Sequence, residues 1–159
     1  MLESVLEPQY FNCVKSPQSG KILTNLSEFL MEALLDKKDD VLPRDVAFWF
    51  RLGLRYYETN APDQMERHLV LLGLFYAANG KHSTAEGLYR QAISKLEGDY
   101  NMCYSLVMAK NLYGRLLLKD PKRENEAARH LKESEELAKT LPYWWNHADH
   151  VFVQNFDLK

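Results

Sequence analysis

Residues 66–98 are the stretch that most constrains what this chain can fold into. An apolar run of ten residues, Leu69 to Ala78, is followed by Asn79-Gly80 and then by a second segment with apolar residues at helical spacing. Asn and Gly both tolerate the left-handed backbone that ends a helix. A membrane helix needs about 20 apolar residues, so the run is better interpreted as a central helix buried nearly all round. The stretch therefore predicts two helices folded back on each other.

Small residues stand where these two helices are expected to approach each other. Gly73 has no Cβ and lets a neighbouring helix come close. Ala85 and Ala92 are seven residues apart, so they share one face of the second helix, and Tyr89 fills the space beside them. Ser83 and Thr84 are the expected caps of the second helix.

The order of these residues resembles the signature of the tetratricopeptide repeat (TPR). That signature is a bulky residue, then Leu-Gly, then Tyr, then a small residue, an aromatic and another small residue. The matching residues are Leu69, Leu72, Gly73, Tyr76, Ala85, Tyr89 and Ala92, with Leu69 where an aromatic is usual. The resemblance implies antiparallel helical hairpins stacked as a short right-handed solenoid. It also implies a groove that binds a peptide or helix of a partner protein.

A longer version of the pattern follows in residues 100–141. Tyr113-Gly114 is similar to Leu72-Gly73, and the two glycines of these pairs are 41 residues apart, against roughly 34 in the standard repeat. Three further residues match the second helix of the repeat: Ala127, Leu131 and Ser134.

The signature also appears earlier in the chain, at Trp49, Leu52, Gly53 and Tyr56. Gly53 is only 20 residues from the next signature glycine, which leaves no room for a helix between them. We therefore expect the helix over 44–59 to close an irregular first hairpin with a helix over 22–36. Five apolar residues of that helix are expected to face the core: Leu26, Phe29, Leu30, Ala33 and Leu34.

The expected fold is a single all-α TPR-like domain over residues 1–159. It consists of an irregular segment (1–20, with a loop at SPQSG), the irregular first hairpin (22–59), two TPR-like repeats (63–98 and 100–141) and a capping tail (142–159). Solenoids usually cover the hydrophobic flank of their last repeat, which favours the cap. The alternative is that the aromatic tail docks on another protein.

The overall charge bears on partners and location. The net charge of −2 argues against broad nucleic-acid or membrane-surface binding. Cys13 and Cys103 lack the spacing of a zinc site and fit two reduced thiols in a cytoplasmic protein. The N-terminus resembles neither a secretory signal nor a transit peptide.

Catalytic and metal patterns are weak. His147, Asp149 and His150 could face one metal on a helix, but no HExxH motif and no second cluster accompany them. The other histidines are scattered and are expected on the surface or at helix ends: His68, His82 and His130. A metal-dependent enzyme is thus a remote alternative, and we expect no enzyme activity and no cofactor.

The expected function is a non-catalytic adaptor or assembly factor that binds a protein partner. Arg44, Arg51 and Arg55 share one face of their helix, opposite Phe48, Leu52 and Tyr56, and could hold an acidic peptide. A solvated face with local salt bridges explains the same pattern. The clamp by which some TPR proteins hold a C-terminal carboxylate cannot be placed, because residues 69–72 are apolar.

Two sets of residues are the expected partner contacts. The groove set is Arg51, Arg55, Tyr57 and Arg90. In the alternative, a permanent subunit docks on its complex through the tail residues Trp144, Trp145, Phe152 and Phe156. Neither the partner nor the oligomeric state follows from the sequence.

Overall fold

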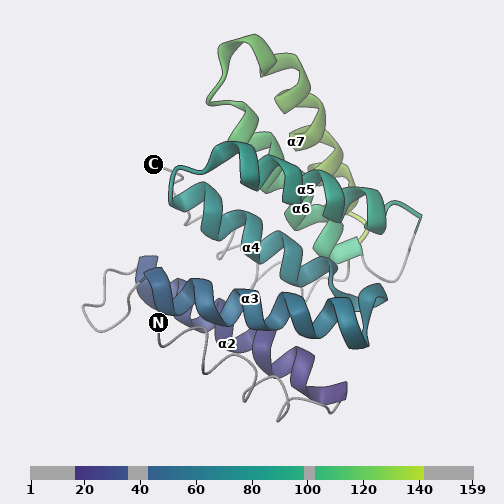
Figure 1. The fold of residues 1–159 in the computed structure, drawn as a ribbon. Helices are drawn as coiled ribbons and strands as arrows, with labels where there is room; N and C mark the ends of the chain where they lie inside the picture. The colour runs from purple at the N-terminus through teal and green to yellow at the C-terminus, as the bar shows by residue number, and fades with distance from the viewer. Residues whose placement is uncertain (1–16, 36–42, 99–102, 142–159) are drawn as a thin grey trace. The chain divides into compact units, whose positions relative to one another are not determined.

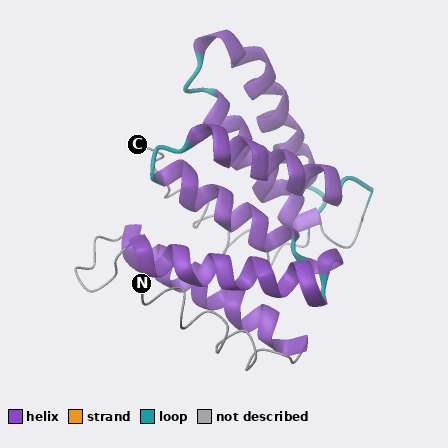
Figure 2. Cartoon of the chain, in the orientation of Figure 1, coloured by secondary structure: helices purple, strands orange, loops and turns teal. Residues whose placement is uncertain are grey.

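The computed structural model describes residues 17–35, 43–98 and 103–141, and every regular element in these ranges is a helix (Figure 2). In chain order they are α2 (Pro17–Leu35), α3 (Pro43–Asn60), the short 3-10 helix η1 (Pro62–Gln64), α4 (Glu66–Ala78), α5 (His82–Leu96), α6 (Cys103–Leu117), η3 (Pro121–Arg123) and α7 (Glu124–Ala138) (Figure 1). The all-α prediction is confirmed. None of these helices is long and apolar enough to cross a membrane.

Contacts along the chain divide it into two compact units, residues 1–68 and 69–159, with the boundary inside α4. In the first unit α2 packs against α3. In the second unit α6 packs against both α5 and α7. The single domain, the right-handed solenoid arrangement and the cap stay predictions, and residues 142–159 lie outside the described part.

The first helix begins earlier than the sequence predicted. The segment Pro17–Gly20 was expected to be a loop, but it forms the first turn of α2. Proline is tolerated at the first helical position because its nitrogen has no hydrogen-bond partner to lose there. Gly20 is buried: a Cβ added to it would lie 2.6 Å from the Tyr56 ring of α3. The helix over 44–59 is confirmed as α3, with Pro43 as its first residue.

The turn between α4 and α5 lies where Asn79-Gly80 predicted it. Gly80 has φ of +73°, the left-handed conformation that glycine adopts without a Cβ clash. The Lys81 amide donates to the Tyr76 carbonyl at 2.9 Å and the Gly80 amide to Ala77 at 3.0 Å, the pair of bonds of a Schellman motif. The caps predicted for α5 are wrong, since Ser83 and Thr84 lie within its first turn and Lys81 at the N-cap makes no side-chain cap bond.

Glycine and alanine make close contacts in the second unit, as the spacing predicted. A Cβ at Gly73 would lie 2.6 Å from the Tyr89 ring, and one at Gly114 would lie 2.8 Å from Cγ of Leu131. The alanines beside these contacts are fully buried: Ala85, Ala92 and Ala127. Both helical hairpins of this unit thus use one glycine opposite one large side chain.

Candidate interaction surface

In its described part, helix α2 buries Leu23 together with small and polar side chains, and it exposes two large apolar side chains. Its buried residues in the described part are Gly20, Leu23, Thr24 and Ser27. Ile22 is 63% exposed and Phe29 is 62% exposed, with the half-buried Leu26 between them. The predicted core position of Phe29 is therefore wrong. Nothing is described of the side chains of Leu30, Ala33 and Leu34.

A buried chain of hydrogen bonds explains why α2 turns this face inward. The Tyr57 hydroxyl lies 2.9 Å from Thr24 Oγ1, and that oxygen lies 3.3 Å from Nδ1 of His68. Nε2 of His68 lies 2.8 Å from the Phe50 carbonyl. These contacts join α2, α3 and the start of α4. Because unpaired polar groups are costly to bury, the pairing fixes the rotation of α2.

The direction of each hydrogen bond in this series follows from the Phe50 carbonyl at its end. A carbonyl only accepts, so Nε2 of His68 carries the proton. Burial lowers the pKa of His68 to about 4, so the ring is neutral and Nδ1 is an acceptor. The Thr24 hydroxyl then donates to Nδ1 and accepts from Tyr57. His68 was expected on the surface or at a helix end. It lies in the first turn of α4, and the surface position is wrong because the residue is fully buried.

Tyr57, one of the predicted partner contacts, belongs to this buried series of hydrogen bonds. Its side chain is buried, and burial raises the pKa of its hydroxyl although the bond to Thr24 acts in the opposite direction. It therefore contributes no accessible surface to a partner in this fold.

The surface of α3 carries the predicted basic stripe. Arg44, Arg51 and Arg55 are all exposed, and Leu52 and Tyr56 are buried on the other side of the helix. Phe48 was expected opposite the arginines together with Leu52 and Tyr56, and this position is wrong. It is half-buried and lies four residues after Arg44, which places it on the arginine side.

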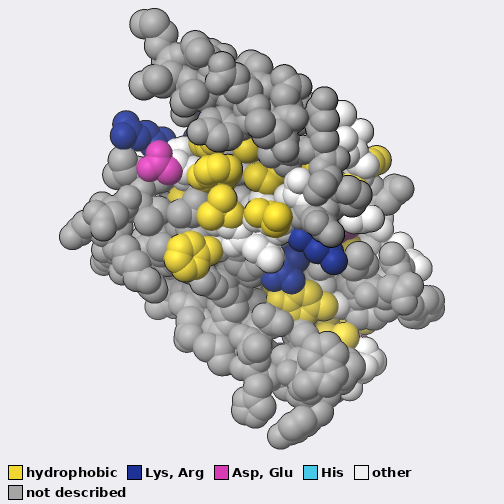
Figure 3. Space-filling model, turned by 90° about the horizontal axis from the view of Figure 1, so that it is seen from below, with side chains coloured by type: hydrophobic (Ala, Val, Ile, Leu, Met, Phe, Trp, Pro, Cys, Tyr) yellow, Lys and Arg dark blue, Asp and Glu magenta, His cyan; other side chains and the backbone are white. Residues whose placement is uncertain are grey.

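Figure 3 shows the molecule from below the view of Figure 1, the side on which α2 lies beneath α3. Hydrophobic side chains are gathered at the surface there, Lys or Arg side chains lie at two places beside the group, and an Asp or Glu side chain lies next to one of them. The exposed apolar residues of α2 and the exposed basic residues Lys21, Arg44, Arg51 and Arg55 all belong to the first unit. The exposed apolar face of α2, with Ile22 and Phe29, is the candidate interaction surface.

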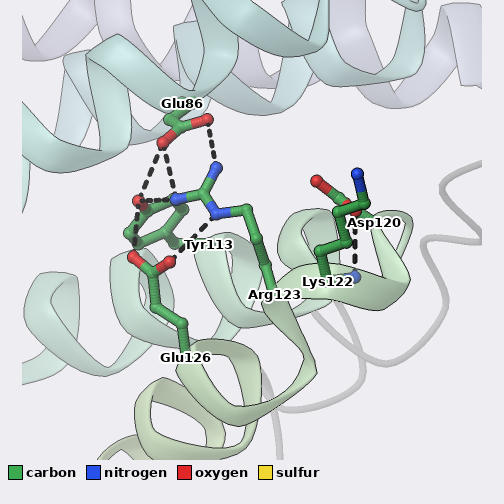
Figure 4. Close-up of polar contacts among 6 residues, drawn as sticks. All are labelled: Glu86, Tyr113, Asp120, Lys122, Arg123 and Glu126. Atoms are coloured by element: carbon green, nitrogen blue, oxygen red, sulfur yellow. Dashed lines mark hydrogen bonds and ion pairs between the residues drawn. The ribbon is translucent and has the colours of Figure 1, made fainter.

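The second unit contains a compact ion-pair cluster around Arg123, at the start of α7 (Figure 4). The guanidinium donates to both carboxylate oxygens of Glu86 at 2.8 and 2.9 Å, and to Glu126 at 2.9 Å. The Tyr113 hydroxyl donates to Glu86 at 3.1 Å. These bonds from Arg123 hold the pKa values of both carboxyl groups below their usual range. The cluster fastens α5 to the turn between α6 and α7.

A second cluster surrounds the buried Lys110 of α6. Its amine donates to Glu133 at 2.6 Å and to Glu97 at 3.1 Å. Burial disfavours the charged amine, but the two carboxylates outweigh this and raise the pKa of Lys110. His130 is buried, which contradicts its predicted surface position, and its ring lies 4.7 Å from that of Tyr113. Burial lowers the pKa of His130.

These two clusters connect the helices of the second unit through charged side chains. The carboxylates of Glu86 and Glu133 are each held by a basic side chain, Arg123 and Lys110 respectively. Within the described ranges, no group of three or more His, Cys, Asp or Glu residues could hold a metal ion. The predicted metal candidates His147, Asp149 and His150 lie outside those ranges.

The structure brings together only part of the predicted contact set. Arg51 and Arg55 share the exposed face of α3, whereas Arg90 is exposed on α5 in the other unit. The tail residues lie outside the described part of the chain: Trp144, Trp145, Phe152 and Phe156. Sequence reasoning missed Ile22 altogether. The indication it could have used is the stripe of small residues at Gly20, Thr24 and Ser27, which marks the true contact face of α2.

Comparisons with known proteins give no relative: no protein-family model, curated protein or solved structure matches the chain. The TPR resemblance therefore stays a prediction based on the chain's own residues.

Proposed function

We propose that this chain is a non-catalytic protein-interaction module that binds a protein partner on the exposed face of α2. The observation that carries the proposal is the exposed apolar face of α2: Ile22 and Phe29 are more than half exposed, while the same helix buries Leu23, Thr24 and Ser27. Large apolar side chains stabilise a protein when they leave water, by about 25 cal/mol for each Å² buried. A partner gains that free energy by covering them.

The remaining helices are included in the proposal with the arrangement that the sequence predicted. Antiparallel hairpins stacked as a right-handed TPR-like solenoid are the arrangement we propose for α4 to α7, supported by the equivalent contacts of Gly73 and Gly114. Modules of this type act as adaptors or assembly factors by presenting a helical surface. A cytoplasmic location belongs to the same proposal.

Matched variants test this function. Ile22→Gln with Phe29→Gln removes the apolar face, and Leu118→Gln removes an apolar side chain that is 51% exposed in the second unit. All are purified from the native cell with a tag, after thermal melting has shown that each variant folds as the wild type does. We expect one stoichiometric partner to be retained by wild type and Leu118→Gln and lost by the α2 variant.

The partner is then produced separately and its binding to each purified variant is measured. Equal affinity for wild type and the α2 variant would overturn the proposed surface. A partner lost instead by truncation after Leu141 would support docking through the tail.

A further inference from the structure

The turn between α4 and α5, residues 79–81, contains a chemically labile pair of residues. Asn79-Gly80 is the only Asn-Gly pair in the chain, and both residues are exposed. We propose that Asn79 is a site of spontaneous deamidation, and that opening of this turn sets the rate. The reactants are the Asn79 side-chain amide, the Gly80 backbone nitrogen and water. The inference concerns the second unit and does not depend on the surface of α2.

The reaction is an attack by the backbone on the preceding side chain. The Gly80 nitrogen gives its proton to a base in solvent and bonds to Cγ of Asn79. The bond from Cγ to Nδ2 breaks, and ammonia leaves after Nδ2 takes a proton from water. Water then opens the cyclic succinimide. Aspartate forms if the bond between Cγ and the Gly80 nitrogen breaks, and isoaspartate forms if the bond to the Asn79 carbonyl carbon breaks. Glycine favours the attack because it has no Cβ to shield its nitrogen.

The folded turn holds both reacting groups in hydrogen bonds. Nδ2 of Asn79 donates to the Phe75 carbonyl at 2.7 Å, which fastens the side chain against the last turn of α4. The Gly80 amide donates to the Ala77 carbonyl at 3.0 Å, so the proton that must be removed is already shared with an acceptor. Both bonds have to break before Cγ and the Gly80 nitrogen can react.

Contacts on either side keep this turn closed. The Lys81 amide donates to the Tyr76 carbonyl at 2.9 Å, and the Lys81 amine lies 5.7 Å from the centre of the Tyr76 ring. Gly73 lies against the buried Tyr89 ring of α5. The reaction therefore proceeds through a locally opened turn, and its rate follows the open fraction. Two hydrogen bonds of ordinary strength correspond to an open fraction of about one tenth to one hundredth.

The products weaken the turn in which they form. A carboxylate has no proton to donate, so the bond to the Phe75 carbonyl is lost. Its negative charge lies beside the C-terminus of α4, where the helix dipole disfavours an anion. Isoaspartate also lengthens the backbone within a turn that hydrogen bonds close. Deamidation at Asn79 thus loosens the hairpin of α4 and α5.

Peptide-mapping mass spectrometry tests the inference on the full chain, incubated at neutral pH either folded or unfolded in guanidinium chloride. Asn60 is an internal control, because its Nδ2 donates to the Tyr56 carbonyl at 3.0 Å in the same way but the next residue is Ala61. In the unfolded chain we expect Asn79 to convert about tenfold faster than Asn60 or more. In the folded chain we expect Asn79 to convert about tenfold to hundredfold more slowly than in the unfolded chain.

Matched variants test whether the local turn controls the rate. In Gly73→Ala the new Cβ would lie 2.6 Å from the Tyr89 ring, so the contact of α4 with α5 weakens. We expect this variant to raise the folded-state rate at Asn79 by about fivefold or more. Gly114→Ala creates a similar clash with Leu131, between α6 and α7, and should leave that rate unchanged. Asn79→Asp reproduces one product and should lower Tm by about 2–5 °C.

Several outcomes would overturn the inference. One is conversion of Asn79 at equal rates in the folded and unfolded chain, and another is conversion of Asn60 as fast as Asn79 when unfolded. No product in the folded chain, after the unfolded chain has lost all its Asn79, would show that the fold closes the site. Equal acceleration by the two glycine variants would show that the whole unit unfolds, and an unchanged Tm in Asn79→Asp that the product is harmless. If a glycine variant does not fold, the wild-type comparison decides alone.

Discussion

Replacing Thr24 by valine is the sharpest test of the buried hydrogen bonds that orient α2. Valine has nearly the shape of threonine but no hydroxyl. Thr24 is 3% exposed, and its hydroxyl is bonded to Tyr57 at 2.9 Å and to His68 at 3.3 Å. The substitution therefore leaves the Tyr57 donor and the Nδ1 acceptor of His68 buried without partners.

The size of the effect follows from these two groups. A buried polar group that loses its partner costs about 1–3 kcal/mol, and the longer bond to His68 contributes less. We expect Thr24→Val to lower the free energy of unfolding by about 2–4 kcal/mol. For a chain of this length this corresponds to a fall in Tm of about 5–15 °C.

Urea unfolding followed by circular dichroism measures this loss. Thr24→Ser is the matched control, because it keeps the hydroxyl and loses only a methyl group, at a cost of about 1 kcal/mol. Tyr57→Phe removes the orphaned hydroxyl, so the double variant Thr24→Val/Tyr57→Phe should be more stable than the sum of the single effects predicts, by about 1 kcal/mol. The reasoning is refuted if valine costs no more than serine, or if the two effects add.

Three further predictions follow from the packing and the ion pairs. Gly53→Ala should destabilise the protein by about 1–3 kcal/mol in urea unfolding, because the new Cβ would lie 2.4 Å from Cε1 of His68. Gly87→Ala, in open space on α5, should instead stabilise the protein by about 0.5–1 kcal/mol. Burial lowers the pKa of His68 to about 4, so its neutral form stabilises the fold fully above the unfolded pKa of about 6.5. About 3 kcal/mol of the unfolding free energy is lost as the pH falls from there through 4. An NMR titration in which this ring protonates near pH 6.5 in the folded state would contradict the prediction. Arg123 lowers the pKa of Glu86, so the pair stabilises the fold above the usual glutamate pKa, and this contribution disappears as the pH falls through the folded-state pKa. The difference in unfolding free energy between wild type and Arg123→Gln should therefore shrink from pH 7 to pH 3. A constant difference would show that the charge pair is not its cause.

The ion-pair clusters of the second unit could not be predicted from the sequence. Glu86 and Arg123 are separated by 37 residues, and Lys110 and Glu133 by 23. Such pairs form only after α5, α6 and α7 have packed. In the sequence, a charged residue that will form such a pair cannot be distinguished from one on a solvent-exposed helix face. The burial of Lys110 is likewise a consequence of two carboxylates that neutralise it there.

The sequence by itself determined the elements that depend on local chemistry. The Asn79-Gly80 turn follows from the tolerance of both residues for a left-handed backbone, and Gly73 and Gly114 follow from the need for close helix contacts. The turn depends on adjacent residues, and each of the two glycines contacts the helix that follows it in the chain. The all-helical class follows from the same periodicity.

The tertiary structure alone decided which face of α2 is buried. Hydrophobicity predicted that Phe29 faces the core, yet the helix turns Thr24 inward and Phe29 outward. The physical reason is that Gly20 lets α3 approach closely, and that Tyr57 and His68 supply partners for the threonine hydroxyl. Those partners come from residues 33 and 44 positions away. The small residues of α2 could indicate a close contact face, but only the packed structure shows that this face, and not the apolar stripe, is buried.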